Sequence, residues 1–150
     1  MVDLTLIDDI WILLVWTISL IISFSLIIAY FVSRNFRTPP GGLILWEIIG
    51  IFIESFVFVC AQALELSTGM PPYGPWVILY ALYDYALCIQ ATYLIWLSLE
   101  IYIVVTRPLN ANFLTRSKIY HIGCQGFTIS IVIISIIIWF EPPTDKTTCV

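Results

Sequence analysis

Carboxylates inside long apolar runs are the residues of this sequence best suited to do chemistry. Glu47 and Glu54 lie seven residues apart in one run, and Asp84 and Glu100 lie sixteen apart in the next. The first spacing places both side chains on one face of a helix. No Lys or Arg occurs within the apolar runs. Because a charged carboxylate in lipid costs several kcal/mol, we expect each to be protonated, hydrated, bound to a cation or paired with residues outside the runs.

A polar and aromatic stripe surrounds the middle carboxylate. Tyr80, Asp84 and Cys88 recur at every fourth residue and therefore share one helical face. Gln90 is offset from this stripe. The depth of Glu54 in its own run favours a polar cavity that holds a small cationic or polar ligand, and we predict that Asp84, Tyr80 and Glu54 bind it. Ordinary helix packing, with hydroxyl groups hydrogen-bonded across a bundle, is the equally weighted alternative.

The remaining reactive side chains do not assemble into a catalytic or metal-binding pattern. Cys60, Cys88, Cys124 and Cys149 form no C-x-x-C pair and no Cys/His spacing typical of zinc. His121 is the only histidine, and we expect it at the membrane interface. Since no nucleophile, general base and orienting group occur together, we expect no enzyme activity, no cofactor and no metal.

Four apolar runs must position these residues. The chain is 61% hydrophobic and 11% charged, with a mean hydropathy of +1.01, which excludes a soluble globule and gives no indication of nucleic-acid binding. A membrane span takes about 20 apolar residues. The runs of sufficient length are residues 10–32, 43–64, 76–105 and 119–140. We predict a single all-α transmembrane domain over residues 1–150, a bundle of four helices in contact with the lipid bilayer.

The basic residues predict the orientation of this bundle. Five of the six occur in two short segments, Arg34 and Arg37 in the first, and Arg107, Arg116 and Lys118 in the second. Basic residues are retained on the cytoplasmic side during membrane insertion. Both segments should therefore face the cytoplasm, which places the N-terminus and the C-terminus on the non-cytoplasmic side.

The run 97–109 resembles the cytoplasmic end of the third helix in seven-helix G protein-coupled receptors. The positions that match are Glu100, Tyr102, Pro108 and Leu109. Ile101 stands where the family has its central arginine. The resemblance implies a cytoplasmic coupling surface, read by a G protein, formed by Glu100, Tyr102, Arg107, Pro108 and Leu109. Independently of the resemblance, Glu100 lies where Arg107 or interfacial water can satisfy its charge.

Other segments are more similar to the cyclic-AMP-receptor-like and secretin-like branches of that family. These segments are Trp96, the run 120–126, and the basic link 34–46. Of the Trp-Gly-x-Pro pattern that those branches carry in the fourth helix, only Gly126 is present. Cys149 stands where such receptors place a cysteine of the second external loop. The resemblance covers roughly residues 33–150 and corresponds to the first four helices of such a receptor.

Two functions from different classes fit the sequence. The first is a receptor-like protein that senses a ligand and is coupled to a cytoplasmic G protein. The second is a non-catalytic four-span accessory subunit of a larger membrane complex, whose neighbours pair with the carboxylates. A proton or cation path through Glu47 and Glu54 is less favoured, because two carboxylates on one helix make no continuous relay. We expect a native reading frame that continues past Val150 into further apolar spans if the receptor hypothesis is correct.

Overall fold

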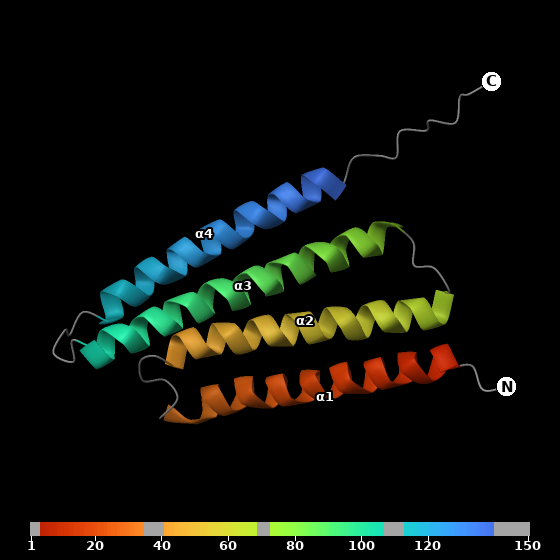
Figure 1. Cartoon of the computed structure of the whole chain (residues 1–150), viewed down its shortest axis with the longest axis horizontal. Coiled ribbons are helices and arrows are strands. Elements are labelled where there is room, and N and C mark those ends of the chain that lie inside the picture. The colour runs from red at the N-terminus through yellow and green to blue at the C-terminus, as the bar shows by residue number, and fades with distance from the viewer. Residues whose placement is uncertain (1–3, 35–40, 69–72, 107–112, 140–150) are drawn as a thin grey trace, which may run out of the picture.

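Four helices make up the part of the chain that the structure, a computed structural model, describes, namely residues 4–34, 41–68, 73–106 and 113–139. In chain order they are α1 (Leu4–Val32), α2 (Gly41–Thr68), α3 (Tyr73–Thr106) and α4 (Phe113–Trp139) (Figure 1). Each helix is long and apolar enough to cross a membrane. The prediction of an all-α membrane protein with four spans is therefore confirmed.

The helices extend beyond the apolar runs that predict them. Both α1, from Leu4, and α4, from Phe113, begin six residues before their predicted spans. Hydropathy marks the hydrocarbon layer only, whereas a helix continues until its backbone hydrogen bonding is interrupted. Pro75 lies in the first turn of α3, where its missing N–H breaks no helical bond. With 34 residues, α3 measures about 50 Å, so in a hydrocarbon layer about 30 Å thick it tilts or reaches the headgroups.

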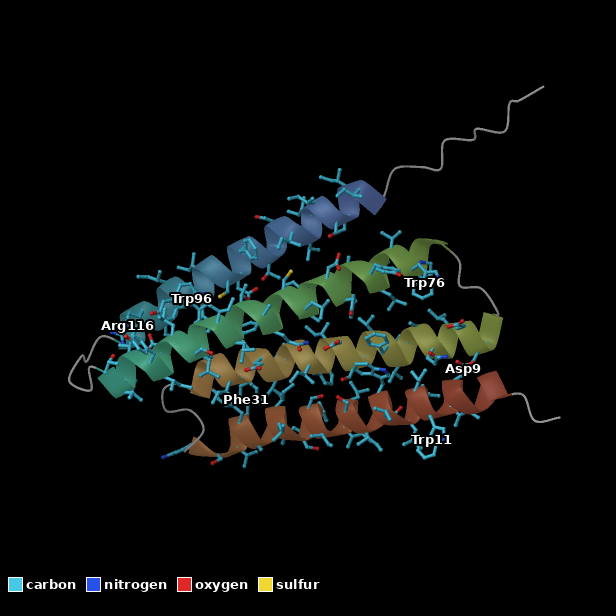
Figure 2. The ribbon with its side chains drawn as sticks, viewed as in Figure 1. Asp9, Trp11, Phe31, Trp76, Trp96 and Arg116 are labelled. Carbon is cyan, nitrogen blue, oxygen red and sulfur yellow. The ribbon has the colours of Figure 1, made fainter. Side chains whose placement is uncertain are left out.

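The helices pack as a bundle in the order of the chain, with α1 against α2, α2 against α3, and α3 against α4 (Figure 1). Neighbours run antiparallel, so the end of α1 and the start of α4 lie at the same end of the bundle. Arg34, Arg116 and Lys118 lie at this end, called here the basic end. Asp9, Trp11 and Trp76 lie at the opposite end (Figure 2). Which end faces the cytoplasm stays a prediction.

The buried core lies between α2, α3 and α4, in the half of the bundle nearer the basic end. Its members are Leu43, Ile89, Tyr93 and Cys124. Trp46 of α2 stacks on Tyr93 of α3, with ring centroids 5.8 Å apart and planes 15° from parallel. At Gly50 the two helices approach so closely that a Cβ atom would lie 2.7 Å from Cγ of Gln90. The absence of a side chain at this glycine therefore allows α2 and α3 to pack in this register.

The two outer helices present extensive apolar surface. Exposed aliphatic and aromatic side chains of α1 include Trp11, Ile21 and Phe31, and those of α4 include Ile122, Ile137 and Ile138. Two serine hydroxyl groups on this surface are hydrogen-bonded within their own helices. Ser25 and Ser130 each donate to the carbonyl of the residue four positions earlier, at 2.8 Å. Satisfied hydroxyl groups and apolar side chains suit a helix surface in contact with lipid.

Candidate functional site

A cavity of about 300 Å³ lies between α2 and α3, toward the end of the bundle opposite the basic end. From α2 it is lined by Val57, Phe58, Ala61, Gln62 and Glu65, and from α3 by Trp76, Leu79, Tyr80 and Tyr83. We call it the α2–α3 cavity. Both sets of residues repeat the helical spacing of i, i+3, i+4 and i+7, which places each set on one face of its helix.

Aromatic rings form much of the wall of the α2–α3 cavity. Phe58 and Tyr83 meet edge to face, with ring centroids 5.5 Å apart and planes 86° apart. The rings of Trp76 and Tyr80 lie 5.7 Å apart on α3. Trp16 of α1 stacks on Phe58 of α2, with ring centroids 4.2 Å apart and planes 9° from parallel. Helix α1 therefore supports the α2 side of the wall. The Phe58–Tyr83 contact thus joins the α2 side of the wall to the α3 side.

The predicted ligand residues separate into different environments. Tyr80 lines the α2–α3 cavity. Glu54 lies deeper in the bundle, where its Oε2 accepts a hydrogen bond of 2.8 Å from Nε2 of Gln90. Asp84 is half-buried, one helical turn from Tyr80, and is not part of the cavity lining. The structure therefore does not bring Asp84, Tyr80 and Glu54 together around one cavity, and their joint role in ligand binding stays a prediction.

The residues that sequence reasoning missed are Gln62, Glu65 and Trp76. Trp76 stands at the start of an apolar run, where an aromatic belt at the membrane interface is the usual interpretation. The sequence did contain a signal for this lining, namely two stripes with the same helical spacing, at positions 58, 61, 62 and 65 and at positions 76, 79, 80 and 83. Two such stripes separated by a short link face each other when the helices form an antiparallel hairpin.

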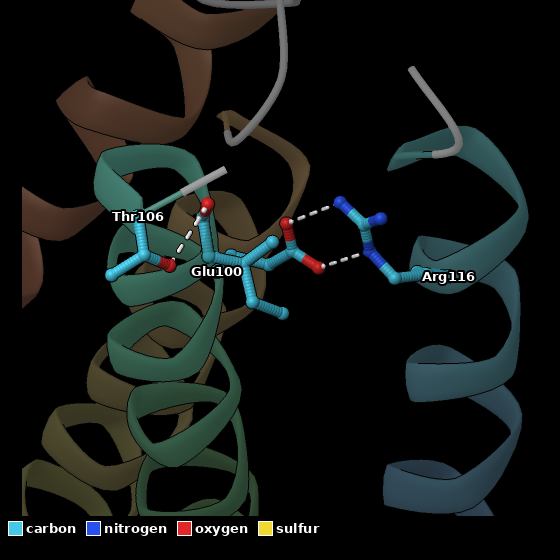
Figure 3. Close-up of polar contacts among 4 residues, drawn as sticks. Glu100, Thr106 and Arg116 are labelled. Atoms are coloured by element: carbon cyan, nitrogen blue, oxygen red, sulfur yellow. Dashed lines mark hydrogen bonds and ion pairs between the residues drawn. The ribbon is translucent and has the colours of Figure 1, made fainter. Parts of the chain in front are cut away.

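An ion pair joins α3 to α4 at the basic end of the bundle (Figure 3). Nε of Arg116 donates to Oε1 of Glu100 at 3.0 Å, and its Nη2 donates to Oε2 at 3.3 Å. Glu100 is only 1% exposed, whereas the Arg116 side chain is 22% exposed. Just beyond, in the last turn of α3, the Thr106 hydroxyl donates to the carbonyl of Tyr102 at 2.8 Å. Among the described residues, Arg116 therefore pairs with Glu100, a contact that the sequence did not indicate; Arg107, which the sequence suggested, lies outside them.

The predicted coupling surface is described only in part. Glu100 is buried in its ion pair and so presents no surface to a partner protein. Tyr102 is 65% exposed at the basic end. Arg107, Pro108 and Leu109 lie outside the residues that the structure describes. In this structure Glu100 joins α3 to α4, and the coupling role of all five residues stays a prediction.

A chain of hydrogen bonds links Tyr85 and Tyr93 of α3 to Gln125 and His121 of α4. Tyr85 donates to Oε1 of Gln125 at 3.1 Å, and Nε2 of Gln125 donates to the hydroxyl of Tyr93 at 3.4 Å. The same hydroxyl shares a hydrogen bond of 2.8 Å with Nδ1 of His121. His121 also lies against the Trp46 ring, at 6.1 Å between centroids, so it belongs to the buried helix contact. The expectation that His121 lies at the membrane interface stays a prediction, and it did not include these contacts.

An aromatic stack completes the contact between α3 and α4. The rings of Trp96 and Tyr120 lie 4.2 Å apart and 15° from parallel, next to the ion pair along both helices. Within the described ranges, no group of three or more His, Cys, Asp or Glu side chains is placed to share a metal ion. The arrangement leaves a cavity of small-molecule size between α2 and α3 and holds α3 against α4 at the opposite end.

Comparison with known proteins adds no family to these observations. No family model matches the chain, and neither a curated protein nor a solved structure matches it. The chain is a four-span membrane protein in which the α2–α3 cavity and the Glu100–Arg116 ion pair lie at opposite ends of one long helix.

Proposed function

We propose that this chain is a receptor-like membrane protein in which a ligand bound in the α2–α3 cavity changes the contact between α3 and α4 at the basic end. The observation that carries the proposal is the α2–α3 cavity itself, a volume of about 300 Å³ with aromatic walls and a carboxylate at one end of the bundle. Cavities of this size, mostly apolar with a few polar groups, are typical of small-molecule sites.

The helix α3 supplies the connection between the two ends. It lines the cavity with Tyr80 and Tyr83, contributes Tyr93 to the buried core, and ends in the ion pair through Glu100. A continuous helix moves as one rigid element, so a shift at the cavity is felt at the ion pair. A ligand produces such a shift only by binding one helix arrangement more tightly than another. Couplings of about 1–3 kcal/mol are typical for such linked sites.

The resemblance to G protein-coupled receptors supports the finer part of the proposal. Tyr102 is exposed at the basic end, next to the segment that contains Arg107, Pro108 and Leu109 in the sequence. If this end faces the cytoplasm, as the basic residues predict, a G protein contacts this segment. The ion pair then holds the resting arrangement of α3 and α4, and its release exposes the coupling surface.

The test is the signalling output of ion-pair variants. The native reading frame that contains this chain is expressed in reporter cells, and dissociation of Gα from Gβγ is followed by resonance energy transfer for a panel of Gα classes. We expect Glu100→Gln and Arg116→Gln to raise the ligand-independent signal, because each removes the charge pairing that holds the resting arrangement. Loss of roughly 1.4 kcal/mol corresponds to about a tenfold change in the ratio of the two arrangements.

The matched control is Lys118→Gln, which removes one exposed positive charge from the same end of α4. We expect it to signal as the wild type does. The proposal is rejected if wild type and ion-pair variants reach the cell surface in equal amounts and none produces a signal with any Gα class. Asp84→Asn tests the sequence-based ligand assignment separately, since an unchanged ligand response and unchanged stability remove Asp84 from the site.

A second candidate is a non-catalytic accessory subunit of a larger membrane complex. It is favoured by the extensive exposed apolar surfaces of α1 and α4, which offer two flanks for neighbouring helices. Solubilisation of native membranes in a mild detergent, followed by purification through an affinity tag, discriminates between the candidates. A stable complex of fixed stoichiometry, together with silent ion-pair variants, identifies a subunit.

A further inference from the structure

The described lining of the α2–α3 cavity combines one negative charge with aromatic side chains. Of the residues that the structure describes around it, Glu65 is the only one with a formal charge, and Gln62, one turn before Glu65, adds a polar amide. The remaining wall is apolar or aromatic, with Trp76, Tyr80 and Tyr83 on the α3 side. A negative charge beside the faces of aromatic rings attracts cations and repels anions.

A second cavity in the same protein provides a contrast. It lies between α3 and α4, has a volume of about 460 Å³, and is lined by Tyr85 and aliphatic side chains without a formal charge. Such a cavity suits an acyl chain or another apolar group. The α2–α3 cavity differs because Glu65 adds a formal charge and three aromatic side chains of α3 line it. The linings of the two cavities therefore differ in charge and aromatic content.

The position of the α2–α3 cavity along the helices further restricts the class of cation that suits it. Glu65 lies two residues from the end of the α2 span, and Trp76 lies two residues after the start of the α3 span. Trp76 is placed at the end opposite Arg116 (Figure 2). Residues at span ends lie at the level of the lipid headgroups, where water and small solutes have access. Inorganic cations are strongly hydrated and need several oxygen ligands, whereas a substituted ammonium ion is satisfied by ring faces and one carboxylate.

We propose that the α2–α3 cavity binds a substituted ammonium ion, held by the carboxylate of Glu65 and the ring faces of Trp76, Tyr80 and Tyr83. The inference rests on the proposed function, because it names the ligand class of the same cavity. The ammonium group is supplied either by a free amine such as choline or by the choline headgroup of a phospholipid. Both sources present the same methylated nitrogen to the same side chains.

The test uses the 150-residue chain, labelled with 5-fluorotryptophan and reconstituted in nanodiscs of phosphatidylglycerol. Choline is titrated, and the ¹⁹F resonance of Trp76, assigned by its loss in Trp76→Phe, reports occupancy. We expect a saturable shift of this resonance, while the resonances of Trp46 and Trp96, which lie nearer the basic end, stay unchanged. 3,3-Dimethyl-1-butanol, which has the shape of choline without its charge, should leave the Trp76 resonance in place.

Variants identify the groups that bind the cation. We expect Glu65→Gln to weaken choline binding about fivefold, the size of effect for one partly exposed charge pair. Glu47→Gln, a matched change on the other end of the same helix, should bind choline as the wild type does. Tyr80→Phe keeps the ring face and should keep binding, whereas Tyr80→Leu should weaken it several-fold. The proposal is overturned if the neutral analogue shifts Trp76 as choline does, or if Glu65→Gln and Glu47→Gln bind choline equally.

Nanodiscs of phosphatidylcholine distinguish the two sources. If the lipid headgroup occupies the cavity, the Trp76 resonance differs between the two lipids without added choline, and Glu65→Gln abolishes that difference. If a free amine is the ligand, the Trp76 resonance is the same in both lipids and choline shifts it equally. Absence of both effects overturns the inference.

The outcome separates this inference from the proposed function. Choline binding at Trp76 without any change in G-protein signalling supports the ligand class and removes the receptor role. Ligand-independent signalling by Glu100→Gln, combined with no choline effect at Trp76 in either lipid, keeps the receptor role and removes the ligand class.

Discussion

Glu100 illustrates at the scale of single residues how this protein accommodates a charge within a membrane. A carboxylate that is 1% exposed is stable only if its charge is compensated, and both of its oxygens accept bonds from one guanidinium group. The planar fork of Arg116 suits this geometry, which a lysine in its place does not reproduce. The charge of Glu100 thus explains the placement of Arg116 on α4.

Removing one partner of the Glu100–Arg116 ion pair should lower the stability of the protein. We expect Arg116→Ala to lower the free energy of unfolding by about 3–5 kcal/mol, because it leaves a buried carboxylate uncompensated. Glu100→Gln should cost less, since the Arg116 head is partly exposed and recovers water. The exchanged pair, Glu100→Arg with Arg116→Glu, should recover part of the loss. Unfolding in mixed micelles with increasing denaturing detergent measures these differences, and equal stability of Arg116→Ala and wild type contradicts the expectation.

Removal of two different buried hydroxyl groups should have opposite effects on the stability of the protein. The Thr128 hydroxyl is buried and has no hydrogen-bond partner among the described residues, so Thr128→Val should leave stability unchanged or raise it by up to about 1 kcal/mol. Tyr93→Phe removes a hydroxyl that is bonded to His121 and Gln125, and should cost about 1–2 kcal/mol. The same unfolding assay compares both variants, and a larger loss in Thr128→Val than in Tyr93→Phe contradicts the structure.

At the scale of helices, α2 and α3 form the pair on which the cavity and much of the core depend. Their close approach at Gly50 sets the register that brings Gln90 opposite Glu54. Sequence reasoning placed Gln90 off the predicted ligand stripe and could not find this pairing, because the register between two helices depends on side-chain volumes at the contact rather than on spacing within one helix. Arg116 was missed as the partner of Glu100 for the same reason.

Gly50→Ala tests this register. A Cβ atom there would lie 2.7 Å from Cγ of Gln90 and 3.2 Å from Cγ2 of Ile89, so one of these side chains must move or the helices must separate. We expect a loss of about 1–3 kcal/mol in unfolding free energy. Gly126→Ala is the matched control, because nothing lies within 4 Å of its added Cβ, and it should stabilise α4 by up to about 1 kcal/mol. Equal effects of the two variants refute the close approach.

At the scale of the whole molecule, composition determined the fold class and packing determined the site. The four spans were predictable because each apolar run is much longer than a soluble helix requires, and the observed helices contain nearly all of the predicted residues. The α2–α3 cavity was not predicted, because its lining becomes adjacent only when two helices pack. The clustering of basic residues predicts the orientation, which the arrangement of helices does not test.

Orientation can be tested by labelling single cysteines in a background without the native ones. Lys118→Cys lies at the basic end and should react with a membrane-impermeant maleimide only after the cells are permeabilised. Ser67→Cys, exposed at the opposite end of α2, should react in intact cells. Gel-shift detection of the labelled protein reads both outcomes, and the reverse pattern would place the basic end outside.

The packing of each helix against the one before it has a consequence for biogenesis. As α2 enters the bilayer it finds α1 already there, and α3 and α4 each find their partner in the same way, so assembly can follow the order of synthesis. Contacts between neighbours in sequence close short loops and form rapidly. The α3–α4 hairpin, which carries the Glu100–Arg116 ion pair, acquires the compensating guanidinium only when α4 arrives. The ion pair therefore forms only after α3 is in place, and the arrival of Arg116 is the step that joins the two helices at the basic end.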